Sequence, residues 1–415
     1  MSNGRGLLVG TAVVLVGLAA AVAFVTRERP LPALRQGGTL TVANAMSGST
    51  EGYARAVEPR DFHFPEDHGP HPEFRTEWWY WTGNLETEDG RAFGYQFTLF
   101  RNALAPETDA APRDSAWGAR QVYMGHFTVT DVAGGTFHAS ERFSRVALGL
   151  SGATARPFKV WLEDWETASV DASAMWPMRL RAQTDDVALE LLLEPGKTPV
   201  LHGERGLSQK SAERGNASYY YSMTRMPSRG TVRVGGTSYT VKGHSWMDRE
   251  WSTSALGADQ VGWDWFSLQL SDGSELMYYQ LRHRDGAPDA YSSGLWVPPE
   301  GAGEPVHLRR EDMKLVVQDT WKSPRSGGEY PSRWRMHVEK LGLDLTVTPR
   351  LADQELPVTV LYWEGTVGLE GSRQGQPVAG RGYVELTGYA DTQGPRRQES
   401  QARGTPDEAA TQAPP

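Results

Sequence analysis

Short runs of alternating apolar and polar residues, separated by turn signals, fill the chain from Asp61 to about Tyr389. Because successive side chains of a strand point to opposite faces, this alternation predicts half-buried β-strands. Helical periodicity is scarce, so the pattern predicts an all-β body of sandwiches or barrels. The clearest predicted strands are Glu77–Leu85, Phe93–Phe100, Tyr123–Val132, Val187–Leu193, Ser218–Met223, Thr231–Val234, Trp265–Leu270, Glu275–Arg282, Leu343–Thr348 and Tyr383–Leu386.

One strand–turn–strand pattern occurs twice. The first copy runs from Trp79 to Phe97 around Asp89-Gly90, and the second runs from Trp265 to Leu281 around Asp272-Gly273. Asp-Gly between alternating runs indicates a hairpin, because Gly tolerates the positive φ of the turn. Unrelated hairpins share these features, but the repeat favours two similar β domains in tandem.

The composition divides the chain into five segments. Met-Pro-Ser-Arg-Gly at 226–230 interrupts the alternation and marks the expected boundary between the two domains. Past Asp391 the chain is rich in Gln, Pro, Arg, Glu, Ala and Thr, which is typical of disorder. The expected segments are a signal or anchor (1–29), a linker (30–57), two β domains (58–228 and 229–391) and a disordered tail (392–415).

The N-terminus carries an uncharged, apolar segment from Gly6 to Val25, with Arg5 before it and Arg27 after it. At about 20 residues, a helix here is long enough to span a bilayer. The segment ends in Ala21-Val22-Ala23, which also fits a signal-peptidase site. A retained anchor and a cleaved signal both remain open. Either one predicts a protein of the cell envelope, periplasmic or attached to the inner membrane by residues 6–25.

Composition excludes several classes of function. The net charge of −9 and the absence of a basic run argue against a nucleic-acid partner. The chain has no cysteine, which excludes disulfide scaffolds, iron–sulfur clusters and thiol nucleophiles. Fifteen Trp, fifteen Tyr and twelve Phe suit either an enclosed lipophilic ligand or a thick β-sandwich core.

Two apparent motifs carry little weight. His63, His68 and His71 lie among Pro residues with no strong metal-ligand spacing, so a surface loop is a better interpretation than a metal site. Gly243-His244-Ser245-Trp246-Met247 lacks the second Gly of a nucleophile elbow, which argues against a serine hydrolase.

The first informative cluster is Arg75-Thr76-Glu77-Trp78-Trp79-Tyr80-Trp81-Thr82-Gly83. On a strand, Glu77, Trp79 and Trp81 share one face, and Trp78 and Tyr80 share the other. Since both faces carry large aromatic rings, we expect one face in the core and the other against a cavity or a second sheet.

The second cluster interleaves carboxylates with tryptophans. An apolar setting disfavours the charged form of a carboxyl group, so a buried acid stays protonated near neutral pH and can act as a general acid. Aromatic faces stabilise a nearby cation by about 0.5–2 kcal/mol. Together these features suit protonation of an alkene.

The alternative is that the acids pair with arginines such as Arg249, Arg282 or Arg284 in an ordinary core. The cluster comprises His244, Trp246, Asp248, Glu250, Trp251, Trp263, Asp264 and Trp265.

Both clusters carry a family resemblance. Phe-Arg-Thr-Glu-Trp-Trp-Tyr-Trp-Thr-Gly-Asn-Leu (74–85), after Asp-Phe-His-Phe-Pro-Glu-Asp-His-Gly (61–69), resembles a signature of the AttH-like and carotenoid 1,2-hydratase family. Residues 243–251 and 263–266 resemble the other signature, and the resemblance covers about residues 58–390. The second signature here lacks the His- and Asn-rich run of carotenoid hydratases, so the AttH branch is the better match.

The resemblance implies two lipocalin-like β domains that enclose a hydrophobic site. It also implies cofactor-free hydration of a terminal alkene of an acyclic carotenoid or related prenyl chain, with Asp248 matching the family's acid. Members of the AttH branch are generally exported and often linked to transport components.

Our leading hypothesis is therefore an envelope hydro-lyase acting on a prenyl or polyene lipid, with neither a metal nor a cofactor. A non-catalytic lipid carrier or accessory of a membrane transport system is the alternative, and a purely structural envelope protein is the third. The expected catalytic residues are Asp248 and His244, and the expected substrate-binding residues are Trp79, Tyr80, Trp246, Trp251, Trp263, Trp265 and Glu77.

Overall fold

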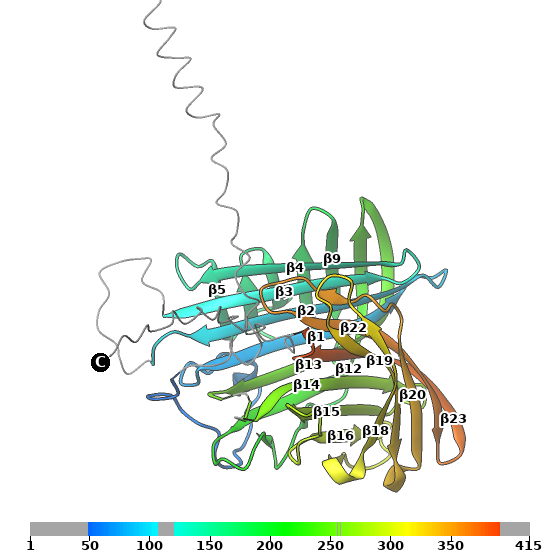
Figure 1. The fold of residues 1–415 in the computed structure, drawn as a ribbon. Helices are drawn as coiled ribbons and strands as arrows, with labels where there is room; N and C mark the ends of the chain where they lie inside the picture. The colour runs from blue at the N-terminus through cyan, green and yellow to red at the C-terminus, as the bar shows by residue number, and fades with distance from the viewer. Residues whose placement is uncertain (1–48, 107–119, 255, 258, 391–415) are drawn as a thin grey trace, which may run out of the picture. The chain divides into compact units, whose positions relative to one another are not determined.

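The computed structural model describes residues 49–106, 120–254, 256–257 and 259–390 (Figure 1). The expected N-terminal helix at 6–25 and the expected tail at 392–415 lie outside the described residues. Within the described part, no helix is long and apolar enough to cross a membrane.

The first sheet contains 13 strands, and its central path runs β4-β3-β2-β1-β13-β12-β9-β8-β7-β6-β5. All its pairings are antiparallel, and β10 and β11 pair with β12 beside this path. The strands are β1 (Thr76–Glu86), β2 (Ala92–Ala103), β3 (Gln121–Asp131), β4 (Thr136–Arg145), β5 (Ser151–Ala155), β6 (Phe158–Leu162), β7 (Trp165–Ser169), β8 (Met178–Gln183), β9 (Val187–Leu193), β10 (Val200–Leu201), β11 (Leu207–Gln209), β12 (Ala217–Val234) and β13 (Thr237–Ser252).

The second sheet contains 10 strands in the order β17-β16-β15-β14-β23-β22-β20-β19-β18, with β21 beside β22. The described residues also contain the short 3₁₀ helices η1 (Glu66–His68), η3 (Arg310–Asp312) and η4 (Glu339–Leu341). The strands are β14 (Gln260–Leu270), β15 (Glu275–His283), β16 (Ser293–Val297), β17 (Val306–Arg309), β18 (Lys314–Lys322), β19 (Glu329–Val338), β20 (Leu343–Pro349), β21 (Glu355–Leu356), β22 (Tyr362–Arg373) and β23 (Gln376–Thr387).

The two sheets share one topology. Each opens with a meander of four strands, and the first strand of each meander also pairs with the last strand of its sheet, β1 with β13 and β14 with β23. The repeated hairpin occupies the same place in both, with Gly90 and Gly273 at φ of 85° in the two turns. The prediction of an all-β fold with two lipocalin-like, barrel-like sheets in tandem is confirmed.

The chain passes from the first sheet to the second later in the sequence than the expected domain boundary. The boundary placed between residues 228 and 229 lies inside β12, which forms a long hairpin with β13. Pro227 follows a register shift between Met223 and Met226, so the interrupted alternation marks an irregular strand. The last strand of the first sheet, β13, pairs with β1 and ends at Ser252. The second sheet begins at Gln260.

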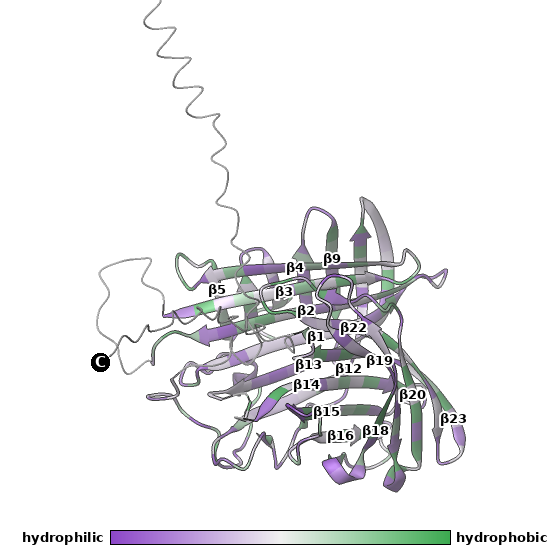
Figure 2. Ribbon diagram, in the orientation of Figure 1, coloured by the Kyte–Doolittle hydropathy of each residue, from purple (hydrophilic) through white to green (hydrophobic). Residues whose placement is uncertain are grey.

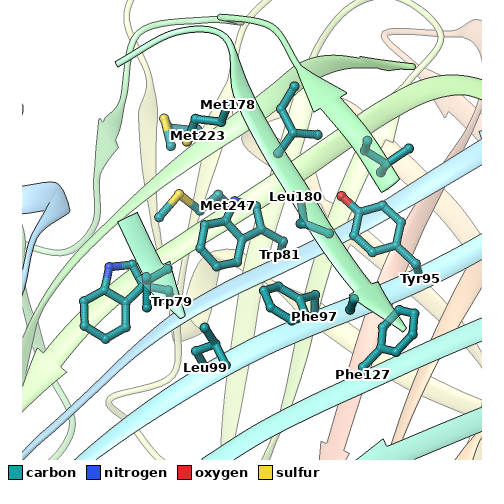
Figure 3. Packing of buried hydrophobic residues seen from close by; sticks show 14 of the residues in the cluster. Trp79, Trp81, Tyr95, Phe97, Leu99, Phe127, Met178, Leu180, Met223 and Met247 are labelled. Carbon is teal, nitrogen blue, oxygen red and sulfur yellow. The ribbon is translucent and has the colours of Figure 1, made fainter. Parts of the chain in front are cut away.

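Each sheet packs around its own apolar core. Hydropathy alternates along many strands, as Figure 2 shows, and many of the apolar residues are buried. In the first sheet Trp79, Trp81, Phe97 and Met247 pack together without exposed surface (Figure 3). A third cluster joins the outer faces of the two sheets, where β1 contacts β23 and β2 contacts β22. Its buried members are Tyr80, Tyr220, Trp246, Trp265, Met277, Tyr279, Leu281 and Tyr383.

Candidate functional site

A cavity lies between the two sheets, beside this third cluster, and not inside either sheet. Its empty volume is about 1180 Å³, including the part that opens to solvent. An apolar pocket with few polar groups is the usual form of a binding site for a small lipophilic molecule. Its walls comprise Thr76, Trp78, Tyr80, Phe100, Asn102, Met124, His126, Lys210, Tyr220, Asp248, Glu250, Ser252, Ser254, Leu256, Trp263, Trp265, Tyr279, Leu281, Val360, Tyr362 and Glu385.

Asp248 is the central acid of the wall that the first sheet provides. It lies on β13 between Tyr80 of β1 and Ser222 of β12, and only 4% of its surface is exposed. Ser222 Oγ donates to Oδ1 at 2.5 Å, and Trp246 Nε1 donates to the same oxygen at 2.6 Å. The Tyr220 hydroxyl donates to Oδ2. The carboxyl group is therefore held in one orientation at the cavity wall.

Burial dominates the protonation of Asp248. It raises the pKa of the carboxyl from an ordinary value of 3.8 to about 7, although the bonds from Ser222, Tyr220 and Trp246 act in the opposite direction. Near neutral pH, Asp248 is thus available both with and without its proton. This matches the working range of a general acid.

A second carboxyl group faces the cavity from the other sheet. Burial raises the pKa of Glu385, on β23, to about 8, a hydrogen bond from Trp263 lowers it, and the charges of Asp248 and Glu250 raise it further. Glu364, directly opposite Glu385 on β22, accepts a hydrogen bond from the Tyr80 hydroxyl. Burial and the charge of Glu385 raise the pKa of Glu364 well above its usual range. Burial therefore favours the neutral form of Glu364, and its carboxyl group anchors the Tyr80 hydroxyl.

Glu250 and Lys210 form the ion pair of the cavity. Lys210 Nζ lies 3.2 Å from Glu250 Oε1 and 4.1 Å from the centre of the Tyr279 ring. The pair satisfies both charges. Within the described part of the chain, by contrast, neither Asp248 nor Glu385 is paired with a cation.

The tryptophan-rich strand β1 separates its two faces as expected. Trp78 and Tyr80 face the cavity, whereas Trp79 and Trp81 fill the core of the first sheet. Trp251 also lies in that core, where its ring stacks on His71 at 3.8 Å between centroids. Of the expected binding residues, Tyr80, Trp263 and Trp265 lie in the cavity wall. Trp246 lies against Asp248. Trp79, Trp251 and Glu77 lie away from the cavity.

Glu77 belongs to a buried ion cluster. Its carboxylate accepts hydrogen bonds from Arg101 and Arg249, and the backbone N–H of His71 lies 3.1 Å from Oε2. Arg249 in turn donates to the carbonyl of Gly69 at 2.6 Å. The cluster holds the segment before β1 against the sheet. Glu77, expected as a substrate-binding residue, thus lies in this ion cluster and not in the cavity wall.

His244 occupies a different surface from Asp248. It is exposed and lines a groove with Arg225, Lys242 and Arg381. Its side chain lies on the same face of β13 as that of Asp248, but four residues separate them, about 13 Å along a strand. The expectation that His244 orients Asp248 or positions water is therefore corrected. Tyr220 and Ser222 hold Asp248 instead.

The histidine-rich segment before β1 is not a surface loop. Asp67, His68 and His71 are buried, and only His63 of the three histidines is exposed. His68 Nδ1 lies 2.6 Å from the Tyr221 hydroxyl, and His71 Nε2 lies 3.0 Å from Asp67 Oδ1. These side chains pack the segment onto the first sheet. Among the described residues, no group of three or more His, Asp or Glu side chains is arranged to hold a metal ion.

The family of the chain follows from its match to known proteins. A family model described as AttH-like matches residues 55–389, which include both sheets and the cavity. The chain belongs to the AttH-like family. Its recognition from the two tryptophan-rich signatures is thereby confirmed.

Several proteins of known structure or activity are similar to this AttH-like chain. An AttH protein from Nitrosomonas europaea is 34% identical, with coverage of 81% of this chain and 99% of that one and a TM-score of 0.71. Kievitone hydratase of Fusarium solani subsp. phaseoli is 22% identical over 248 residues, which are 58% of this chain and 68% of the relative. The crystal structure of kievitone hydratase from Nectria haematococca shares the fold, with a TM-score of 0.62 at 15% identity over 82% of this chain and 98% of that one.

Proposed function

We propose that the protein is a hydratase that adds water to a carbon–carbon double bond of a lipophilic molecule bound between its two sheets. The observation that carries the proposal is Asp248, a buried carboxyl group with a pKa of about 7 in the wall of an aromatic cavity. Membership in a family that resembles hydratases, and the similarity to kievitone hydratase, support it.

The reaction begins with proton transfer from Asp248. The protonated carboxyl gives its proton to one alkene carbon, the π electrons form the new C–H bond, and the neighbouring carbon becomes a cation. Ser222, Tyr220 and Trp246 then stabilise the carboxylate that remains, since each donates a hydrogen bond to it. Water adds to the cation and releases a proton, so that the overall change is addition of H and OH. No cofactor is required for this sequence of steps.

The aromatic walls suit the cationic intermediate. Trp78, Tyr80, Trp263 and Trp265 line the cavity next to the acid, and the face of each ring attracts positive charge by about 0.5–2 kcal/mol. The same rings exclude bulk water and bind an apolar chain. A prenyl or polyene lipid, including an acyclic carotenoid, fits this combination of an aromatic, apolar wall and a buried acid.

The proposed setting is the cell envelope. Residues 6–25 would deliver the body to the periplasm or hold it at the inner membrane, where lipophilic alkenes dissolve. A transport component is a further proposed partner, and no nucleic acid is expected to bind.

The test is native mass spectrometry of the full-length chain purified gently from its own host. A co-purifying prenyl or polyene lipid that gains the mass of one water on incubation supports the hydratase, and Asp248→Asn should bind the lipid without changing it. A bound lipid that neither protein changes favours the non-catalytic carrier. An empty protein that binds no added lipophile favours a structural role.

A further inference from the structure

The cavity holds a second acidic group whose role the proton transfer from Asp248 leaves open. Addition of water requires a group that accepts the proton of the attacking water molecule, and a carboxylate is suited to this. Asp248 and Glu385 reach the cavity from different sheets, on β13 and β23 respectively. A molecule between the sheets therefore has one carboxyl group on each side.

Trp265 connects the two carboxyl groups. It lies directly opposite Glu385 in the pairing of β14 with β23, so the two side chains share one face of the second sheet. Its indole Nε1 donates to the Tyr220 hydroxyl at 3.1 Å, and Tyr220 donates to Asp248. A reacting double bond over Trp265 would thus lie between Asp248 and Glu385, with the cation above the ring.

The other acids near the cavity are already engaged. Glu250 forms an ion pair with Lys210 at 3.2 Å, and Glu364 accepts a hydrogen bond from the Tyr80 hydroxyl. Glu385 accepts a hydrogen bond from Trp263, but it is partly exposed to the cavity and is not paired with a cation among the described residues. It is therefore the acid placed to meet a water molecule there.

We propose that Glu385 is the second catalytic carboxyl group and takes the proton of the water molecule that adds to the cation formed by Asp248. This inference rests on the proposed hydration. The water oxygen forms the new C–O bond, its O–H bond breaks, and the proton passes to the Glu385 carboxylate. A proton then returns from Glu385 to Asp248 through cavity water, which restores both groups.

The pKa values of Asp248 and Glu385 are compatible with the return of a proton from Glu385 to Asp248. The pKa values are about 7 for Asp248 and about 8 for Glu385. When the pair holds one proton, the form with the proton on Asp248 is therefore only about tenfold less populated than the reverse form. The reactive form is thus accessible near neutral pH.

The experiment incubates the full-length chain with geranylgeraniol, lycopene or kievitone in D₂O or in H₂¹⁸O and follows both labels by mass spectrometry. Deuterium on carbon reports proton transfer from the acid, and ¹⁸O reports addition of water. Wild type should incorporate both labels into at least one probe. Glu385→Gln should keep deuterium exchange, because Asp248 can give and retake a proton, and should lose ¹⁸O incorporation by about 100-fold or more. Asp248→Asn should lose both.

Matched variants separate catalysis from folding. Glu370→Gln, at an exposed position of β22 outside the cavity wall, should leave both labels as in wild type, and Glu385→Asp should restore part of the ¹⁸O incorporation. Wild-type ¹⁸O incorporation in Glu385→Gln would overturn the role of Glu385, as would equal loss of both labels in a folded protein. Absence of both labels in wild type with all three probes would overturn the hydratase proposal itself.

Discussion

Tyr220 of β12 is the diagonal neighbour of Asp248 on the paired strand β13, and the Tyr220 hydroxyl donates a hydrogen bond to Asp248 Oδ2. The same hydroxyl accepts a hydrogen bond from Trp265 of the second sheet at 3.1 Å. Tyr220 thus links the acid of one sheet to the aromatic wall of the other. Because the bond stabilises the carboxylate, it limits the rise in the pKa of Asp248 that burial produces.

Tyr220→Phe should raise the pKa of Asp248 above about 7. The substitution removes a donor to the charged form and leaves the burial of the group unchanged. The measurement is a titration of the ¹³C-labelled aspartate carboxyl groups by NMR. Tyr95→Phe is the matched control, because Tyr95 is equally buried but bonds to Ser245 in the core of the first sheet. A pKa that stays or falls in Tyr220→Phe contradicts the assigned hydrogen bond.

Asp248→Asn should stabilise the fold most at alkaline pH. Folding raises the pKa of Asp248 from about 3.8 to about 7, so its neutral form is favoured in the native state. Its contribution to stability is complete below pH 4 and is lost as the pH rises through 7. Since one pKa unit corresponds to about 1.4 kcal/mol and the shift is roughly three units, the variant should gain of the order of 4 kcal/mol at pH 8 relative to pH 4.

Calorimetric unfolding of both proteins at the two pH values measures this difference. Glu385, whose pKa is also raised, contributes a pH dependence of the same direction to both proteins, and its contribution is smaller in the variant because the charge of Asp248 no longer raises the Glu385 pKa. Asp61→Asn, at an exposed position, is the control and should follow wild type. Parallel pH curves for Asp248→Asn and wild type would show that Asp248 is charged in the folded protein.

The strands and one wall of the site were predictable from local pattern. Alternation along β1 separates Trp78 and Tyr80 from Trp79 and Trp81, and the structure places the two pairs in the cavity wall and the core. Asp248 could be singled out because tryptophans flank it in the sequence and the family signature includes it. These are properties of a few consecutive residues.

The remainder of the site depends on which strands become neighbours. Glu385 lies in an ordinary alternating strand, and only the pairing of β23 with β14 brings it beside Trp265. Tyr220 likewise reaches Asp248 through the β12–β13 hairpin, across the position where the sequence suggested a boundary. His244 illustrates the converse. It lies four residues from Asp248 in the sequence, but four residues span about 13 Å along an extended strand.

His244→Ala should leave hydration nearly unchanged. His244 lines the groove with Arg225, Lys242 and Arg381 and contributes no atom to the cavity wall that contains Asp248. We expect kcat/KM within about twofold of wild type, since its removal takes no interaction from the transition state. The measurement is the rate of ¹⁸O incorporation into a probe that wild type hydrates. A loss comparable to that of Asp248→Asn would return His244 to the mechanism.

Glu77→Gln should destabilise the protein by about 3–5 kcal/mol, because it leaves the buried guanidinium groups of Arg101 and Arg249 without their carboxylate. Although burial acts in the opposite direction, these two cations hold the pKa of Glu77 well below its usual range. The stabilisation from Glu77 is therefore present above its ordinary pKa of 4.5 and is lost as the pH falls. The variant should accordingly differ most from wild type near neutral pH.

Urea unfolding at pH 7 measures the loss in Glu77→Gln. Glu58→Gln is the control, since the ion pair of Glu58 with Arg214 is exposed and contributes at most about 1 kcal/mol. Because Glu77 lies in the core of the first sheet and outside the cavity, the fraction of Glu77→Gln that remains folded should bind and hydrate its substrate as wild type does. A stable Glu77→Gln protein that has lost only substrate binding would instead place Glu77 in the functional site.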